Sequence, residues 1–142
     1  MRLTKAAEYG VRCVLVLSLK SEGQVINRRE IASEMQIPEQ FLSKVAQDLA
    51  KAGLIEIVQG SRGGYRMLKP AKHTTLLEVI EAINGNIFLN DCLMASDYCS
   101  RSQFCPVHKV WEKARKQLRQ TLRETTFDQL AKEEINSYTK LS

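Results

Sequence analysis

The stretch that decides the fold is residues 27–53, which read NRREIASEMQIPEQFLSKVAQDLAKAG. A helix is expected over residues 27–35, because Asn27 is a typical N-cap that stands just before an amphipathic run. A second helix is expected over residues 38–52, because its apolar residues recur at helical spacing and Gly53 can end it. Two helices joined by so short a turn make a helix-turn-helix, whose second helix enters the major groove of DNA.

The flanking sequence completes a winged helix-turn-helix. A mostly buried helix is expected over residues 5–20. Two strands, 54–58 and 65–68, are expected on either side of a glycine-containing turn. Beyond them the periodicity predicts further helices, and one long segment lacks any period. The expected ranges are a helix at 75–84, the aperiodic segment at 86–105, a long helix at 107–124 and a short helix at 126–134.

The expected fold class is therefore mainly α, with a winged helix-turn-helix DNA-binding domain, a small β-hairpin wing and a long C-terminal dimerisation helix. Residues 1–72 form the DNA-binding domain in this interpretation. Residues 73–142 hold a cluster-binding loop and the dimerisation helices. A structureless loop as long as 86–105 is uncommon in a small chain unless it has a function.

The composition limits the class of protein. The chain has 142 residues, of which 44% are hydrophobic, and this is enough for a core. No apolar run reaches the roughly 18 residues needed to cross a bilayer, and no signal-peptide cleavage site follows the N-terminus. We therefore expect a cytoplasmic protein with no membrane partner.

Positive charge is concentrated in the first half of the chain. Residues 1–72 contain 12 Lys or Arg and 7 Asp or Glu, whereas residues 73–142 contain 9 of each, so the whole net charge of +5 lies in the first half. A basic domain beside a neutral one favours a polyanionic partner for the basic domain. Double-stranded operator DNA is the partner that fits the helix-turn-helix pattern.

Polar residues stand where a winged helix-turn-helix touches DNA. Gln can bind adenine, Lys suits guanine or phosphate, and Ser suits base edges or phosphate. Arginines at the start of the first helix suit phosphates, and an arginine at a wing tip can enter a minor groove. Each of these residues alone also fits an ordinary exposed surface. The candidate DNA-binding residues are Arg28, Arg29, Glu39, Gln40, Ser43, Lys44, Ser61, Arg62 and Gly63.

The most informative pattern is formed by Cys92, Cys99, Cys105 and His108. Three thiolates and an imidazole can complete a zinc site or hold an iron–sulfur cluster. The first two intervals exceed the two to four residues that commonly separate paired zinc ligands, so the spacing favours a larger, multi-iron group. Free thiols beside an unrelated histidine are the alternative.

Other chemistry-bearing residues have plainer interpretations. Cys13 stands in an apolar helix and is expected in the core, His73 is expected to be solvated, and Trp111 is expected in the core or a dimer interface. No nucleophile–base pair or phosphate-cradling loop is recognisable. We therefore expect neither an enzyme nor a small-molecule substrate.

Three motifs together resemble a known family. Residues 1–12 include MRLT and EYGVR, residues 62–65 read RGGY, and the three-cysteine loop follows in matching order. In this combination the chain resembles the IscR/NsrR/RirA-type (Rrf-two) family of winged-helix transcription regulators, over about residues 1–135. The resemblance implies a homodimeric repressor or activator in which the helix at 107–124 forms much of the dimer interface.

The resemblance also implies a cofactor. In IscR-like members three cysteines and a histidine hold a 2Fe–2S cluster, which carries over to Cys92, Cys99, Cys105 and His108, although the first interval is one residue longer than in IscR. NsrR-like members hold a 4Fe–4S cluster with three cysteines and a carboxylate from the partner's first helix, and Glu8 occupies the position of that carboxylate. Both remain open, and the 2Fe–2S cluster with His108 is preferred.

The function expected from the sequence is DNA binding switched by an iron–sulfur cluster, in response to cluster supply, redox state or nitric oxide. The alternative is a zinc- or thiol-based regulatory module that acts through a partner protein. Neither interpretation identifies the operator or the regulated genes.

Overall fold

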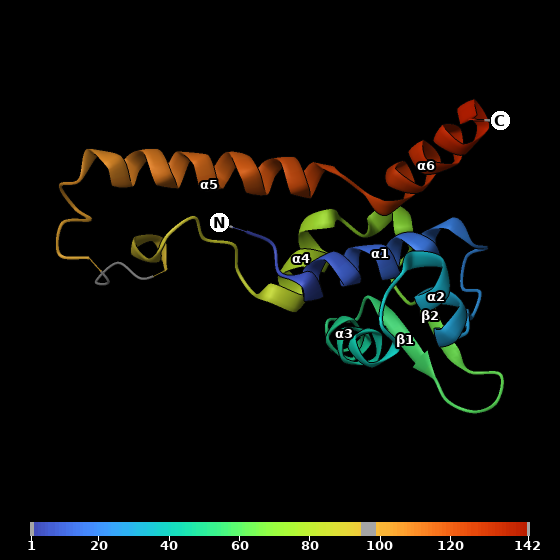
Figure 1. The fold of residues 1–142 in the computed structure, drawn as a ribbon. Coiled ribbons are helices and arrows are strands. Elements are labelled where there is room, and N and C mark those ends of the chain that lie inside the picture. Colours follow the sequence, from blue (N-terminus) through green and yellow to red (C-terminus); the bar gives the residue numbers. More distant parts are fainter. Residues whose placement is uncertain (1, 95–98, 142) are drawn as a thin grey trace.

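The structure is a computed structural model that describes residues 2–94 and 99–141. Its first half is the expected winged helix-turn-helix, with three helices followed by a two-stranded antiparallel sheet (Figure 1). The elements are α1 (Lys5–Leu19), α2 (Arg28–Met35), α3 (Glu39–Lys51), β1 (Ile55–Val58) and β2 (Gly64–Met67). The expectation of a mainly α fold with a small β-hairpin is confirmed.

Helix α1 is the centre of the fold, and it packs against α3, α4 and α6. Its side chains of Val14 and Val16 are fully buried, as is Cys13. The continuous apolar run from Cys13 to Leu17 is explained by these neighbours, because this part of α1 is covered on several sides, whereas polar residues remain accessible nearer the start of the helix. The expectation that Cys13 lies in the core is confirmed.

The wing is attached to the rest of the fold through Ile26, just before α2. Strand β1 pairs with β2 in the register Ile55↔Met67, and Ile26 and Tyr65 exchange two backbone hydrogen bonds of 2.9 Å. Tyr65 is 4% exposed. The hairpin is therefore tied to the start of the helix-turn-helix as well as to α3.

The second half contains η1 (Ala71–His73), α4 (Leu76–Asn84), η2 (Asp91–Leu93), α5 (Pro106–Glu124) and α6 (Phe127–Leu141). Thr75 caps α4 in a complete capping box with Glu78. Helix α5 extends well beyond the winged-helix unit, and α6 begins beside α1 and then runs away from it toward the C-terminus (Figure 1). Phe127 at the start of α6 is 0% exposed and belongs to the same core as α1. The division of the chain at residue 72 stays a prediction.

Two expectations about the second half need correction. The last helix does not end near Glu134 but continues to Leu141, because residues 131–141 contain neither Gly nor Pro to stop it. The aperiodic segment 86–105 is not wholly without structure, since η2 forms within it; residues 95–98 of that segment lie outside the described residues. Over the described residues, no helix is both long and apolar enough to span a membrane.

Candidate DNA-binding surface and metal site

The start of α3 is linked to the start of α2 by side-chain contacts. The Arg28 guanidinium donates a hydrogen bond to Ser43 Oγ at 3.0 Å, and Ser43 in turn donates to the carbonyl oxygen of Glu39 at 3.2 Å. Arg29 lies 3.8 Å from the Glu39 carboxylate. These predicted residues are thus brought together, and the acidic Glu39 partly neutralises one of the two arginines.

The remaining predicted residues of α3, Gln40 and Lys44, are exposed. A groove of about 400 Å³ runs between the helix-turn-helix and the wing, and Arg28, Arg29 and Ser43 line its helical side. Among the lining residues that were not predicted from the sequence, four have polar side chains: Asn27, Gln47, Gln59 and Tyr65. Gln47 stands four residues after Ser43 on the same helix face, so helical periodicity is the signal that identifies it.

The wing tip presents Ser61 and Arg62 to solvent. Gly63 and Gly64 follow, and neither tolerates a side chain. A Cβ at Gly63 would lie 2.1 Å from the carbonyl oxygen of Val58, and a Cβ at Gly64 would lie 2.0 Å from the carbonyl oxygen of Ile26. The glycines are therefore required by close backbone packing, which holds Arg62 at the end of a short, fixed hairpin.

Tyr65 lines this groove and connects the wing with the helix-turn-helix. Burial raises the pKa of its hydroxyl, while hydrogen bonding to Ser43 and the nearby Arg28 guanidinium act in the opposite direction. The hydroxyl is therefore protonated at neutral pH and lies beside the two side chains that link α2 with α3. This arrangement couples the position of the wing to that of α3.

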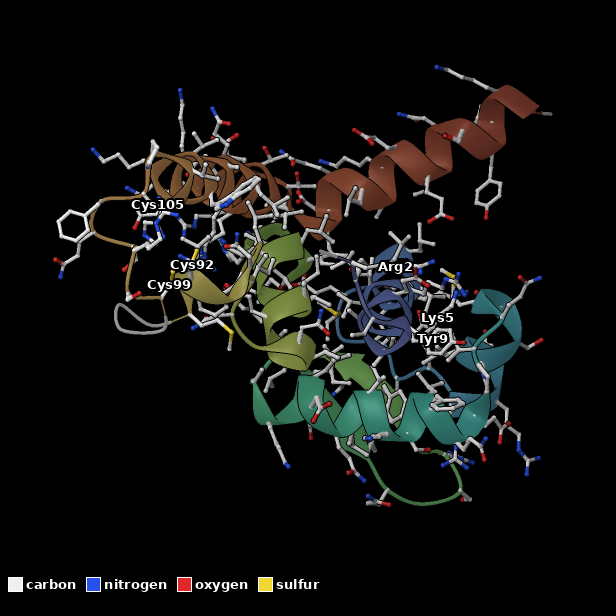
Figure 2. The ribbon with its side chains drawn as sticks, turned by 60° about the vertical axis from the view of Figure 1, so that its left-hand side comes forward. Arg2, Lys5, Tyr9, Cys92, Cys99 and Cys105 are labelled. Atoms are coloured by element: carbon white, nitrogen blue, oxygen red, sulfur yellow. The ribbon has the colours of Figure 1, made fainter. Side chains whose placement is uncertain are left out.

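The three loop cysteines come from different short elements around the beginning of α5, as Figure 2 shows. Cys92 belongs to η2, Cys99 follows the gap in the described residues, and Cys105 is the N-cap residue of α5. All three are free thiols of intermediate exposure. They are accessible to a metal ion or cluster, in contrast to Cys13, whose burial raises its pKa to about 12.

His108 lies in the first turn of α5 and faces the loop. Its Nδ1 is 3.3 Å from Cys92 Sγ, and its Nε2 is 3.2 Å from the Glu112 carboxylate one turn later. A carboxylate at Nε2 favours the tautomer that has its proton there, and Nδ1 is then available as a metal ligand. Imidazole nitrogen and thiolate sulfur are the donors that iron–sulfur and zinc sites use, so the donor set fits such a group.

The ligand set is only partly assembled. Over residues 2–94 and 99–141, no three His, Cys, Asp or Glu side chains converge closely enough to hold a metal ion. Cys92 and His108 lie close together, whereas Glu8, the alternative ligand, lies in the first turn of α1 and pairs with Lys5 at 3.0 Å. The structure therefore brings two of the predicted ligands into contact.

A helix-turn-helix with an arginine-tipped wing defines a winged-helix DNA-binding transcription regulator. Comparison with known proteins specifies this class further: residues 3–133 match the Rrf2 family, described as "Iron-dependent Transcriptional regulator". The chain belongs to this family. Its homologues are transcriptional regulators, which confirms the expectation that it is not an enzyme.

Individual relatives support the assignment over nearly the whole chain. The transcriptional regulator NsrR of Oceanobacillus iheyensis is 30% identical, with 94% of this chain and 92% of that protein covered. The oxidized form of Staphylococcus aureus CymR is 28% identical, with a TM-score of 0.72 and coverage of 92% and 96%. The fold is also similar to that of T. potens IscR, with 24% identity, a TM-score of 0.72 and coverage of 94% and 88%.

Proposed function

We propose that this regulator is a cytoplasmic protein whose DNA binding is switched by an iron–sulfur cluster on the loop before α5. Cys92, Cys99 and Cys105 would hold the cluster as thiolates, with His108 as the fourth ligand of a 2Fe–2S group. The observation that favours this assignment most is the 3.3 Å approach of His108 Nδ1 to Cys92 Sγ. A bound cluster would supply a redox-active and chemically labile group that oxidation, nitric oxide or iron shortage can alter.

The residues around His108 support its role as a ligand. The Glu112 carboxylate at Nε2 orients the ring, as carboxylates do behind metal-bound histidines. The Cys92 thiol also contacts the Asn90 side chain at 3.3 Å, which positions it toward the same space. Both contacts orient the ligand atoms before any metal binds.

The main alternative cofactor is a 4Fe–4S cluster with Glu8 as the fourth ligand, contributed by the partner chain. A Glu8 side chain that is 40% exposed at the start of α1 is compatible with such a bridging role. A different alternative is a thiol switch without a cluster. It is favoured by the similarity to the oxidized form of CymR and by three loop thiols of intermediate exposure. Zinc on the same ligands is a further alternative.

We also propose that the regulator acts as a homodimer. Val107, Val110 and Trp111 lie on one face of α5 and are 48%, 58% and 38% exposed. Neighbouring apolar side chains on an exposed helix face favour a helix-to-helix interface. A two-fold protein also matches the two half-sites of a typical operator.

The decisive experiment is anaerobic purification of four proteins: wild type, His108→Ala, Glu8→Ala and the control His73→Ala. His73 is the second of the chain's two histidines and is exposed, so its loss tests for a general effect of removing a histidine. Iron, sulfide and zinc are quantified, and visible absorption spectra are recorded. We expect a 2Fe–2S cluster in wild type, Glu8→Ala and His73→Ala, and its loss or a shifted spectrum in His108→Ala.

Other outcomes select among the alternatives. A 4Fe–4S cluster that is lost in Glu8→Ala and kept in His108→Ala would overturn the assignment of His108. Stoichiometric zinc without sulfide, or no metal at all after anaerobic purification and attempted reconstitution, would contradict the cluster. Zinc has no redox chemistry and no visible bands, so it is distinguishable from iron.

A further inference from the structure

The exposed side of α1 has a basic and aromatic stripe outside every predicted site. Lys5 and Tyr9 stand one turn apart on this helix, and Arg2 extends from the segment just before it. Figure 2 shows Arg2, Lys5 and Tyr9 together at the N-terminal end of α1. Arg12 lies one turn further along, with its guanidinium carbon 5.7 Å from the centroid of the Tyr9 ring.

This stripe is continuous with the recognition helix. The Tyr9 ring packs against Phe41 of α3, with ring centroids 6.1 Å apart, and Phe41 remains 49% exposed. Arg2 and Lys44 line the same groove of about 510 Å³, which is formed by the N-terminal segment, α3, the end of α4 and residues 86–88 and which also contains the acidic Asp48. Residues Phe41 and Lys44 of α3 thus face α1, whereas Ser43 faces the wing across the other groove.

Helix α3 therefore has a positively charged flank on each side. The wing with Arg62 is one flank, and the start of α1 is the other. The DNA major groove is about 12 Å wide, close to the roughly 10–12 Å diameter of an α-helix, so a helix inserted in it has backbone phosphates along both edges. Lys, Arg and Tyr side chains are common donors to these phosphates.

We propose that Arg2, Lys5 and Tyr9 bind DNA backbone phosphates at the edge of the major groove opposite the wing. The two cations neutralise phosphate charge, and the Tyr9 hydroxyl donates a hydrogen bond. The contacts fix the register of α3 between two phosphate rows, with base recognition left to α3 itself. This inference rests on DNA binding and is independent of the proposed cluster.

Lys5 also has an intramolecular partner that a phosphate would displace. Its Nζ lies 3.0 Å from the Glu8 carboxylate, with the side chains 75% and 40% exposed. Exposed pairs of this kind are weak, because water and salt screen them and both side chains lose rotational freedom. A phosphate can therefore compete with Glu8 for Lys5.

The test measures DNA affinity as a function of salt concentration. The probe is a duplex that the full-length wild-type protein enriches from a random pool, together with a duplex of unrelated sequence. Both are measured with reconstituted and with chelator-treated protein. The variants are Arg2→Ala, Lys5→Ala and Tyr9→Phe, which keeps the ring against Phe41. Lys132→Ala is the control, because Lys132 is 76% exposed and pairs with Asp128 one turn away, as Lys5 pairs with Glu8.

We expect Arg2→Ala and Lys5→Ala each to reduce the slope of log affinity against log salt by about 0.9 for every phosphate that the variant no longer neutralises. The reduction should be the same on both duplexes, since binding to phosphates does not depend on sequence, and Lys132→Ala should leave the slope unchanged. Tyr9→Phe should weaken binding without altering base preference. In ethylation interference, Arg2→Ala, Lys5→Ala and Tyr9→Phe should each lose the signal at phosphates on one edge of the major groove. Arg62→Ala should lose it at phosphates on the opposite edge.

The proposal is overturned if both cation variants keep the wild-type slope. It is also overturned if these variants lose ethylation interference at the same phosphates as Arg62→Ala does. Thermal unfolding of each variant distinguishes weaker DNA binding from a damaged fold, because exposed side chains at this position should not lower the melting temperature when they are removed. If the wild-type protein enriches no sequence, the slopes on the unrelated duplex still support or overturn the proposal.

Discussion

Arg115 Nε donates a hydrogen bond of 2.6 Å to the backbone carbonyl oxygen of Ile87, and its guanidinium lies 4.6 Å from the centroid of the Phe88 ring. Ile87 is 5% exposed and begins the segment that leads to Cys92. Arg115 stands seven residues after His108 on α5, two turns along the same face. One face of α5 thus fixes the start of the cysteine loop and contacts Cys92.

Arg115→Ala should loosen this loop. A hydrogen bond from a charged group contributes about 1.5–3 kcal/mol, so opening of the segment that follows Ile87 should become roughly tenfold or more frequent. Amide hydrogen exchange in residues 87–93 of the apo protein measures this directly. Arg115→Lys should restore only part of the protection, because an ammonium keeps the charge but lacks the planar stacking on Phe88.

A matched control is Lys116→Ala, which removes a neighbouring exposed cation on the same helix. Equal exchange in Arg115→Ala and Lys116→Ala would contradict the anchoring role. If a cluster is bound, a chelator should also remove it faster from Arg115→Ala. The exchange measurement remains valid without a cluster, so the two ideas are tested separately.

Gly64→Ala should disrupt the attachment of the wing. Gly64 has φ +152°, and an added Cβ would lie 2.0 Å from the carbonyl oxygen of Ile26, a backbone atom that cannot move without breaking the Ile26–Tyr65 pair. We expect the free energy of unfolding to fall by about 1–3 kcal/mol or more, and DNA affinity to fall together with it.

Gly23→Ala is the control for Gly64→Ala. Gly23 also has a positive φ, +74°, but a Cβ there meets no atom within 4 Å. The control should therefore lose only the stability that left-handed backbone strain costs, about 1 kcal/mol, and keep its DNA affinity. Similar denaturation midpoints for the two variants would show that the close approach to Ile26 is unimportant.

The winged helix could be predicted from the sequence because its signals are local. The cap at Asn27, the helical spacing and the glycine turn each act within a few residues, and the structure has the corresponding elements. The length of α6 was underestimated, because residues 131–141 contain no Gly or Pro from which the end of the helix could be predicted. Tyr65 was missed as a groove residue because its position depends on pairing with the distant Ile26.

Two features of α5 could not be predicted from the sequence, because they depend on contacts between residues far apart in the chain. The helix at 107–124 was expected to form much of the dimer interface, but its apolar residues Leu118 and Leu122 pack on α4 of the same chain, whereas Val110 and Trp111 remain exposed. Helical periodicity identifies an apolar face of a helix, but it does not show whether the same chain or a partner chain covers that face. Arg115 had no signal at all, because its partner is a backbone carbonyl, which every residue has.

Val110→Asp should weaken the proposed dimer. Val110 is 58% exposed and lies between Val107 and Trp111 on the face of α5 proposed as the interface. Two-fold symmetry would bury the new carboxylate twice, and an unpaired buried charge is strongly unfavourable. Sedimentation should show a monomer at micromolar concentrations where wild type is a dimer.

Lys116→Asp places the same carboxylate on the opposite side of α5 and should leave the dimer intact. A monomeric wild-type protein, or a dimer that Val110→Asp does not weaken, would refute this interface. Binding to a two-half-site operator should fall in parallel with dimerisation, because each half-site would then be bound independently.

Cys13 should make stability depend on alkaline pH. Burial raises its pKa from 9.0 to about 12, so in the folded state the thiol keeps its proton while in the unfolded state it ionises near pH 9. The contribution of the protonated Cys13 thiol to the free energy of unfolding is fully present below the pKa of 9.0 that the thiol has in the unfolded state. It is lost as the pH rises from about 9 toward 12, by up to about 1.4 kcal/mol per pH unit. Cys13→Ala should lower the free energy of unfolding at every pH because it leaves a cavity, but its decline above pH 9 should be shallower. Parallel curves for wild type and Cys13→Ala, measured by denaturant unfolding of the reduced apo protein, would contradict the buried, protonated thiol.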